Sequence, residues 1–457
     1  MPDDALGDDD VTALVARLLR REVSPAELRA AVAARLAAVD PRVRGLGLDR
    51  TDAPVVGNPE GPLAGVPILV KENTDVAGWP TTNGSAAYVP QPARQHAAVT
   101  EQLLGAGLDL VGTSRMPEFG LNATTEFVDA EPTRNPVDPA FSAGASSGGA
   151  AALVAAGAVP VAHANDGGGS IRIPAAACGL VGLKPSRGLL ARSAHGALMP
   201  IDLVADGVVT RTVRDTALVL SALTGEPVRS RTRLRVGVVL HSPAGGEVDA
   251  DTRAAVERSA RRLEAAGHHV EPHRPAVGTG FVDDFLVYWG LLAFAVAAGG
   301  RRSFGPTFER SRLDPLTRGL ARHFLTTGPR RPGFLRRLRR VAYRAEFIHQ
   351  DVLLSPVLAH RTPPLGWLHP AVPFDDLRER LVRYVGFTPL QNVAGAPAVS
   401  VPAGRDGRGL PIGVQLAGLP GDEGVLLGLA GELEAASDVS SSLTSAAWTS
   451  PRISTRW

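Results

Sequence analysis

Cysteine and long apolar runs are what this 457-residue chain most conspicuously lacks. A single cysteine, Cys178, cannot form a disulfide within the chain and leaves a cysteine-based metal site without ligands. No uninterrupted run of about 18 apolar residues occurs, and the acidic start MPDDALGDDD lacks the positive charge of a signal peptide. We therefore expect a cytoplasmic protein that uses no metal and no cofactor and has no membrane partner.

Net charge is also nearly absent. The 48 basic and 46 acidic residues leave a formal charge of +2, too little to attract the phosphates of a nucleic acid, so we expect no nucleic-acid partner. With 44% hydrophobic and 21% charged residues, the composition is that of an ordinary folded protein. The length allows one large α/β domain or two or three smaller ones.

Lysine is the third scarce residue, because Lys71 and Lys184 are the only two among the 48 basic residues. Arginine cannot lose its proton at usable pH, whereas a buried lysine can act as a neutral base. A lysine that persists in an arginine-rich chain is therefore a candidate for proton transfer. For either lysine alone, chance is an equally good explanation.

Apolar periodicity predicts an α/β protein. Apolar residues at three- and four-residue spacing predict two N-terminal helices, separated at Ser24-Pro25, where serine caps and proline begins a helix. Short apolar runs then alternate with alanine-rich helical stretches. We expect N-terminal helices in residues 1–55, an α/β domain in 56–440 with a helical cap at about 275–350, and a loosely ordered tail in 441–457.

The cap region is rich in aromatic residues and arginine. Its aromatic side chains either line a substrate pocket or belong to ordinary packing; they are Tyr288, Trp289 and Phe294, with Trp367 beyond the cap. The helical spacing of the arginine-rich segment 330–344 places Phe334, Leu335, Leu338 and Val341 on one side. This favours a solvated helix face over a binding site for an acidic ligand.

The run Asp166-Gly167-Gly168-Gly169-Ser170 places a hydroxyl directly after three residues without side chains. Several backbone N–H groups can then point at one spot beside the serine, as an oxyanion hole requires. Most glycine triplets are plain loops, so this motif is weak on its own. No phosphate-loop lysine or dinucleotide-binding pattern follows it.

A nucleophilic serine needs a base. His163 lies seven residues upstream of Ser170 in an expected strand, so direct contact is not expected and a structural role is favoured. Lys71 follows the apolar run VPILV; burial at a strand end favours its neutral form. A serine of the segment GASSGG could relay the proton between them.

Three segments together, GVPILVKENTDV, FSAGASSGGAA and HANDGGGSIRIPAAACGLVGLKPS, resemble the amidase-signature hydrolases, which use a Ser, cis-Ser, Lys triad. The resemblance extends over nearly the whole chain. Within the family, the sequence is similar to the branch containing 6-aminohexanoate cyclic dimer hydrolase. It implies an α/β fold in which a large mixed central sheet is covered by helices on both faces. It also implies Ser170 as nucleophile, Ser146 as bridging serine after a cis bond from Ala145, and Lys71 as base.

The resemblance implies further roles near the nucleophile. The oxyanion hole would be formed by the backbone of Gly167, Gly168, Gly169 and Ser170, with Ser147, Asp166 and Arg172 supporting the site. Lys184 matches a structural position, and Cys178 is expected to be a small core residue. Three departures from the usual motif are Glu72, Ala145 and Gly167, none of which removes a reacting group.

The expected activity is hydrolysis of a small-molecule carboxamide through an acyl-enzyme. Three alternatives stay open: an amide synthase or transacylase with the same triad, a glutaminase-like amidotransferase subunit, and a catalytically silent binding protein. The sequence identifies neither the substrate nor the oligomeric state, and a homodimer stays open.

Overall fold

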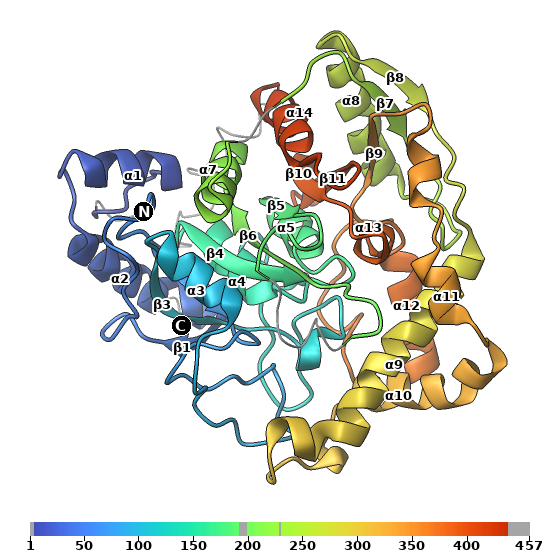
Figure 1. The fold of residues 1–457 in the computed structure, drawn as a ribbon, viewed down its shortest axis with the longest axis horizontal. Coiled ribbons are helices and arrows are strands. Elements are labelled where there is room, and N and C mark those ends of the chain that lie inside the picture. Colours follow the sequence, from blue (N-terminus) through green and yellow to red (C-terminus); the bar gives the residue numbers. More distant parts are fainter. Residues whose placement is uncertain (1–3, 192–198, 228–229, 437–457) are drawn as a thin grey trace, which may run out of the picture.

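The computed structural model describes residues 4–191, 199–227 and 230–436, which form one mixed sheet surrounded by helices (Figure 1). The expected loose tail at 441–457 lies outside the described residues. The strands are β1 (Leu46–Asp49), β2 (Pro67–Lys71), β3 (Asp109–Ser114), β4 (Val161–Asp166), β5 (Val181–Lys184), β6 (Ala205–Thr210), β7 (Arg235–Val238), β8 (His269–Pro272), β9 (Val352–Pro356), β10 (Ala398–Arg405) and β11 (Pro411–Ala417).

The sheet has 11 strands in the order β1-β3-β2-β4-β6-β5-β10-β11-β9-β7-β8. Strand β2 pairs in parallel with β3 and β4, and β7 pairs in parallel with β8 and β9. The remaining pairs are antiparallel. The predicted mixed α/β fold is confirmed.

Helices cover both faces of this sheet, as Figure 1 shows. They are α1 (Val11–Leu19), α2 (Pro25–Val43), α3 (Ala98–Gly105), α4 (Gly148–Ala155), α5 (Arg172–Cys178), α7 (Val213–Thr224), α8 (Ala250–Ala265), α9 (Thr279–Phe304), α10 (Pro315–Thr327), α11 (Phe334–Arg339), α12 (Phe374–Tyr384), α13 (Pro389–Ala394) and α14 (Glu423–Ala435). Alternation along β2 sends Ile68 and Val70 into one apolar core and Leu69 into the other. Strand β2, with Lys71 at its end, is therefore buried on both faces.

The two N-terminal helices form where the sequence predicts them. Ser24 Oγ accepts the N–H of Glu27, and the Glu27 carboxylate accepts the N–H of Ser24. This reciprocal cap, with Pro25 in the first turn, starts α2.

Helices α9, α10 and α11 occupy the region in which the sequence predicts a helical cap. Asp284 of α9 is 2% exposed and forms ion pairs with Arg331 and Arg337. Leu338 is buried, with Phe334, Leu335 and Val341 packed in the same apolar cluster, so the predicted inner side of this segment is confirmed. Two of its arginines therefore attach the segment to α9.

Helix α9 is long and apolar enough to cross a membrane by length and composition alone, with a mean hydropathy of 1.7 over an 18-residue window. This helix has no uninterrupted run of 18 apolar residues, because Asp283 and Asp284 fall near its start and Arg301 and Arg302 near its end. Of that window, 39% is buried inside the protein. The helix packs against α10, and several of its apolar side chains line a cavity in the protein.

Candidate active site

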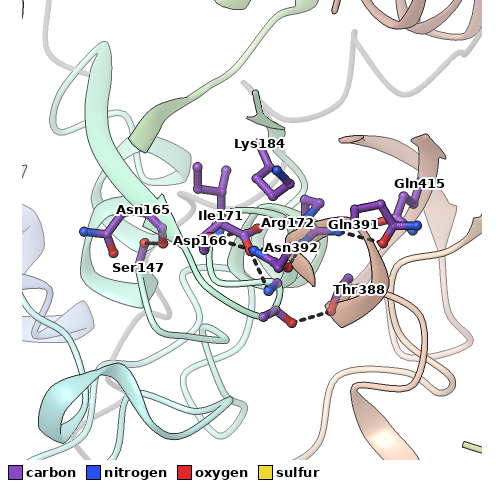
Figure 2. Close-up of polar contacts among 12 residues, drawn as sticks. Ser147, Asn165, Asp166, Ile171, Arg172, Lys184, Thr388, Gln391, Asn392 and Gln415 are labelled. Atoms are coloured by element: carbon purple, nitrogen blue, oxygen red, sulfur yellow. Dashed lines mark hydrogen bonds and ion pairs between the residues drawn. The ribbon is translucent and has the colours of Figure 1, made fainter. Parts of the chain in front are cut away.

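The glycine run lies between β4 and α5 and is organised by one carboxylate. Asp166, the last residue of β4, accepts the N–H of Gly169 at 2.6 Å and that of Ile171 at 3.2 Å. Arg172, which begins α5, donates to both of its oxygens, from Nε at 2.9 Å and Nη2 at 3.0 Å. Figure 2 shows these groups converging on the turn. Asp166 thus fixes the path of the backbone on either side of Ser170.

Both members of this ion pair are completely buried. Burial opposes ionisation of Asp166, but the adjacent Arg172 guanidinium holds the pKa of the carboxyl well below its usual range. Arg172 also donates to Asn392 Oδ1 and to Gln415 Oε1, each at 2.7 Å. The supporting positions expected for Asp166 and Arg172 are therefore joined in one hydrogen-bonded network.

Lys71 ends β2 with its Nζ surrounded by oxygen atoms. Nζ lies 2.7 Å from Ser146 Oγ, 2.8 Å from Asn165 Oδ1 and 3.3 Å from the Asn165 carbonyl oxygen. Burial lowers the pKa of Lys71 to about 7, although Asp166, Asp206 and Glu72 oppose this shift. The surroundings of Lys71 therefore favour its neutral form.

The serine segment before α4 adopts the expected backbone conformation. The Ala145–Ser146 peptide bond is cis, and the next residue, Ser147, donates its N–H to the Ser170 carbonyl at 3.2 Å. Ser147 Oγ donates to the Asn165 carbonyl at 3.3 Å. These contacts place the segment containing Ser146 directly beside Ser170.

Ser170 itself faces a cavity. It is 8% exposed and lines that cavity together with Ala145 and Gly168. Within the described residues its Oγ forms no hydrogen bond, and in particular none to Ser146. The structure therefore brings Lys71 and Ser146 into contact and leaves the Ser170 hydroxyl free to turn.

The backbone donors around Ser170 are not equivalent. The N–H of Gly169 is already bonded to Asp166. The N–H groups of Gly167, Gly168 and Ser170 meet no acceptor among the described residues. Of the four expected oxyanion donors, three are available in this conformation.

Other candidate residues occupy structural positions. The ring of His163 accepts the Lys71 N–H through Nδ1 and lies 3.1 Å from Asp206 through Nε2, and it forms no contact with Ser170. Lys184 donates to the Pro185 carbonyl; its pKa is lowered to about 7 by burial and by Arg172. Cys178 is buried, which raises the pKa of its thiol. Across the described ranges, no group of three or more His, Cys, Asp or Glu side chains could hold a metal ion.

Three site residues were missed in the sequence. Asn165 contacts Lys71, and its position two residues after His163 in a buried strand was the available signal, because both project from the same face. Thr388 donates to the Gly168 carbonyl at 2.6 Å, and Asn392 donates to the Asp166 carbonyl at 2.7 Å. These two lie more than 200 residues from the glycine run, so no local pattern could reveal them.

The cavity beside Ser170 comprises about 860 Å³ of space not occupied by atoms, part of which is open to solvent. Of the four aromatic residues considered from sequence, Trp289 lines it. Tyr288 is buried and bonds to the backbone of Ile201, and Phe294 packs on Phe324. Trp367 packs with Tyr384 and lines a separate surface groove.

The family model described as Amidase matches residues 46–427. This chain belongs to that family. A Mycobacterium tuberculosis protein named "Putative amidase AmiC" is 43% identical over 457 residues, which cover 95% of this chain and 96% of that protein. The 6-aminohexanoate-cyclic-dimer hydrolase of Paenarthrobacter ureafaciens is 33% identical over 472 residues, which cover 93% of this chain and 94% of the hydrolase.

A solved structure supports the same assignment. The structure of 6-aminohexanoate cyclic dimer hydrolase matches with a TM-score of 0.82 and 29% identity, and the match covers 94% of this chain and 96% of that chain. The resemblance inferred from the sequence motifs is thereby confirmed. This amidase-family chain is an enzyme that hydrolyses amide C–N bonds.

Proposed function

We propose that this amidase cleaves a carboxamide through a covalent acyl-enzyme on Ser170, with Ser146 and Lys71 relaying the proton. The observation that carries the proposal is the 2.7 Å contact between Lys71 Nζ and Ser146 Oγ in a buried site where the pKa of the lysine falls to about 7. A neutral amine in that position can accept a proton from the serine.

In the proposed sequence, Ser170 Oγ turns toward Ser146 and attacks the amide carbonyl carbon. The Ser170 proton passes to Ser146 Oγ as the Ser146 proton passes to Lys71. The tetrahedral intermediate collapses, the C–N bond breaks, and the leaving nitrogen takes the proton back through the same relay. Water then attacks the acyl-enzyme and gives a proton to Lys71 through Ser146. The bond to Ser170 Oγ breaks, the relayed proton returns to Ser170, and the carboxylic acid leaves.

Negative charge develops on the carbonyl oxygen in the transition state and requires hydrogen-bond donors that point at it. Each such donor typically lowers the activation barrier by roughly 3 to 4 kcal/mol. The unbonded N–H groups of Gly167, Gly168 and Ser170 are the donors we assign to this role. Asp166 supports the turn by holding the N–H of Gly169. In this assignment Gly169 shapes the oxyanion hole without donating to it.

The test is covalent labelling of the purified enzyme with a fluorophosphonate, followed by intact mass and peptide mapping. The wild-type enzyme should take up one adduct on Ser170, and Ser170→Ala should take up none and lose at least about 10⁴-fold in kcat. Ser303→Ala is a matched control, because Ser303 is exposed at the end of α9. Labelling or substantial turnover in Ser170→Ala would reject the assignment.

The acyl acceptor is tested separately. With water as acceptor, adding hydroxylamine or a primary amine leaves the free acid as the main product at low amine concentration. A transacylase would instead give the new amide as the main product at micromolar amine. Product analysis by mass spectrometry separates hydrolysis from amide synthesis.

A further inference from the structure

The cavity beside Ser170 is walled almost entirely by carbon. Helices α9, α10 and α12 supply most of its side chains, including Phe285, Trp289, Leu316, Leu320, Phe374 and Leu381. Arg378 is the single charged residue in the lining, and its Nη2 lies 3.6 Å from Asp375 Oδ1. No acidic side chain of the described residues lines the cavity.

This apolar wall reaches the reacting centre. The rings of Phe285 and Trp289 stack with centroids 5.5 Å apart. A carbon placed on Gly168 would lie 3.5 Å from Phe285 Cζ and 3.7 Å from the Trp289 ring. A substrate group that extends from the carbonyl bound beside Gly168 therefore meets these two rings first.

The wall offers few polar partners to a ligand. The indole N–H of Trp289 already donates to the Leu121 carbonyl at 3.2 Å. An ammonium group placed in this cavity would lose hydration and find no carboxylate. An alkyl or aryl group would instead remove apolar surface, its own and that of the wall, from water.

We infer that this enzyme selects amides that carry a large, neutral, apolar group, and that the pocket formed by α9, α10 and α12 binds that group. The inference rests on the proposed function, because it assumes that Ser170 is the nucleophile. The name of the Paenarthrobacter ureafaciens relative refers to 6-aminohexanoate, a chain that carries an amine when it is linear. The pocket described above discriminates against that charge and favours the uncharged chain.

Two homologous substrate series test the inference and identify which side of the amide enters the pocket. One series varies the acyl chain in p-nitroanilides from acetyl to octanoyl, and the other varies the alkyl chain of N-alkyl acetamides. In one of them kcat/KM should rise about fourfold for each added methylene until the pocket is filled. Flat or falling values in both series would overturn the inference.

A pair of substrates with chains of equal length tests the charge preference. Heptanoyl p-nitroanilide should exceed 6-aminohexanoyl p-nitroanilide in kcat/KM by at least about 100-fold, because only the second buries an ammonium group. Equal values, or a preference for the amine, would contradict the inference. Labelling of Ser170 by fluorophosphonate is independent of chain length, so it reports on the proposed function alone.

Variants of α12 locate the effect. Leu381→Trp should lower the ratio of octanoyl to acetyl kcat/KM at least about tenfold by filling the pocket, and Leu381→Ala should shift the optimum to a longer chain. Leu325→Trp is the matched control, because Leu325 lies on α10, is 51% exposed and does not line the cavity. An unchanged chain-length profile in both Leu381 variants would reject this pocket as the binding site.

Discussion

Lys71 Nζ lies 2.7 Å from Ser146 Oγ, and among the described residues no carboxylate forms an ion pair with it. The carboxylate whose charge acts most strongly on Lys71, that of Asp166, is paired with Arg172 instead. Neutral oxygen atoms of Ser146 and Asn165 are what surround the amine. This separation of charges lets burial keep the lysine close to neutrality while the carboxylate organises the adjacent turn.

The activity of the wild-type enzyme should follow the deprotonation of Lys71. The neutral amine is the active form and its pKa is lowered to about 7, so kcat/KM should rise with pH and level off above a midpoint of about 7. A pH series with a neutral substrate measures this. A profile flat between pH 5 and 9 would contradict Lys71 as the base.

Lys71→Arg separates charge from proton transfer. Arginine retains the positive charge but cannot release its proton, so kcat should fall at least about 10³-fold at every pH. Arg302→Lys serves as the opposite exchange at an exposed position on α9 and should leave the rate unchanged. Recovery of the Lys71→Arg rate at high pH would point to another base.

Thr388 is predicted to position the glycine run 167–169, which carries two of the backbone N–H groups that we assign to the oxyanion hole. The Thr388 hydroxyl donates to the Gly168 carbonyl at 2.6 Å. A side-chain carbon added to Gly169 would lie only 2.3 Å from Thr388 Oγ1, so the two segments are in close contact. Thr388→Val keeps the shape but lets this peptide unit move, so kcat should fall about ten- to 100-fold with little change in KM. Thr388→Ser should restore kcat; equal losses in the Val and Ser variants would indicate a packing role.

The local chemistry of the site could be predicted because it follows contiguous residues. The strand that buries Lys71, the glycine run before Ser170 and the capped start of α2 each depend on near neighbours. Family resemblance added the cis bond before Ser146, which no propensity predicts. These elements carry their signals within about ten residues.

The rest depends on contacts between distant segments. Thr388, directly before α13, and Asn392, within α13, contact the glycine run and Asp166. Gln415 contacts Arg172 from β11. The antiparallel pairing of β6 with β4 and β5 is likewise set by tertiary packing. Sequence spacing could not reveal that the aromatic residues of α9 lie against Gly168.

The ion pair between Asp166 and Arg172 should contribute strongly to the stability of the fold. Both side chains are fully buried, so Arg172→Met leaves an unpaired buried carboxylate and should lower the free energy of unfolding by about 3 to 5 kcal/mol. The double variant with Asp166→Asn should lose less than the sum of the single losses. Denaturant-induced unfolding of the wild type, the two single variants and the double variant measures these losses in free energy of unfolding.

The contribution of the Asp166–Arg172 pair to the free energy of unfolding should depend on pH, and an exposed ion pair serves as the control. Because the folded-state pKa of Asp166 is lowered, its contribution is present above the unfolded value of about 3.9 and is lost as pH falls below it. Glu22→Gln disrupts the exposed pair with Arg20 and should have no measurable effect on unfolding. Additive losses in the double variant would show that the two charges are not coupled.

The buried Glu118 of the core contacts the half-buried Asp314 at the start of α10. Glu118 accepts the N–H of Asp314 at 2.8 Å and the hydroxyl of Ser85 at 2.7 Å, and Asp314 caps α10. Burial, with the neighbouring Asp314, raises the pKa of Glu118 to about 7. Its stabilising contribution is therefore present below the unfolded value of about 4.3 and is lost as pH rises through about 7.

Glu118→Gln should remove that loss, because an amide stays neutral and its oxygen still accepts a hydrogen bond. Between pH 5 and pH 9 the free energy of unfolding of the wild type should fall relative to this variant by on the order of 2 kcal/mol. Glu379→Gln, at an exposed position of α12, should follow the wild type at both pH values. Parallel pH profiles for Glu118→Gln and the wild type would show that the pKa of Glu118 is not raised in the folded enzyme.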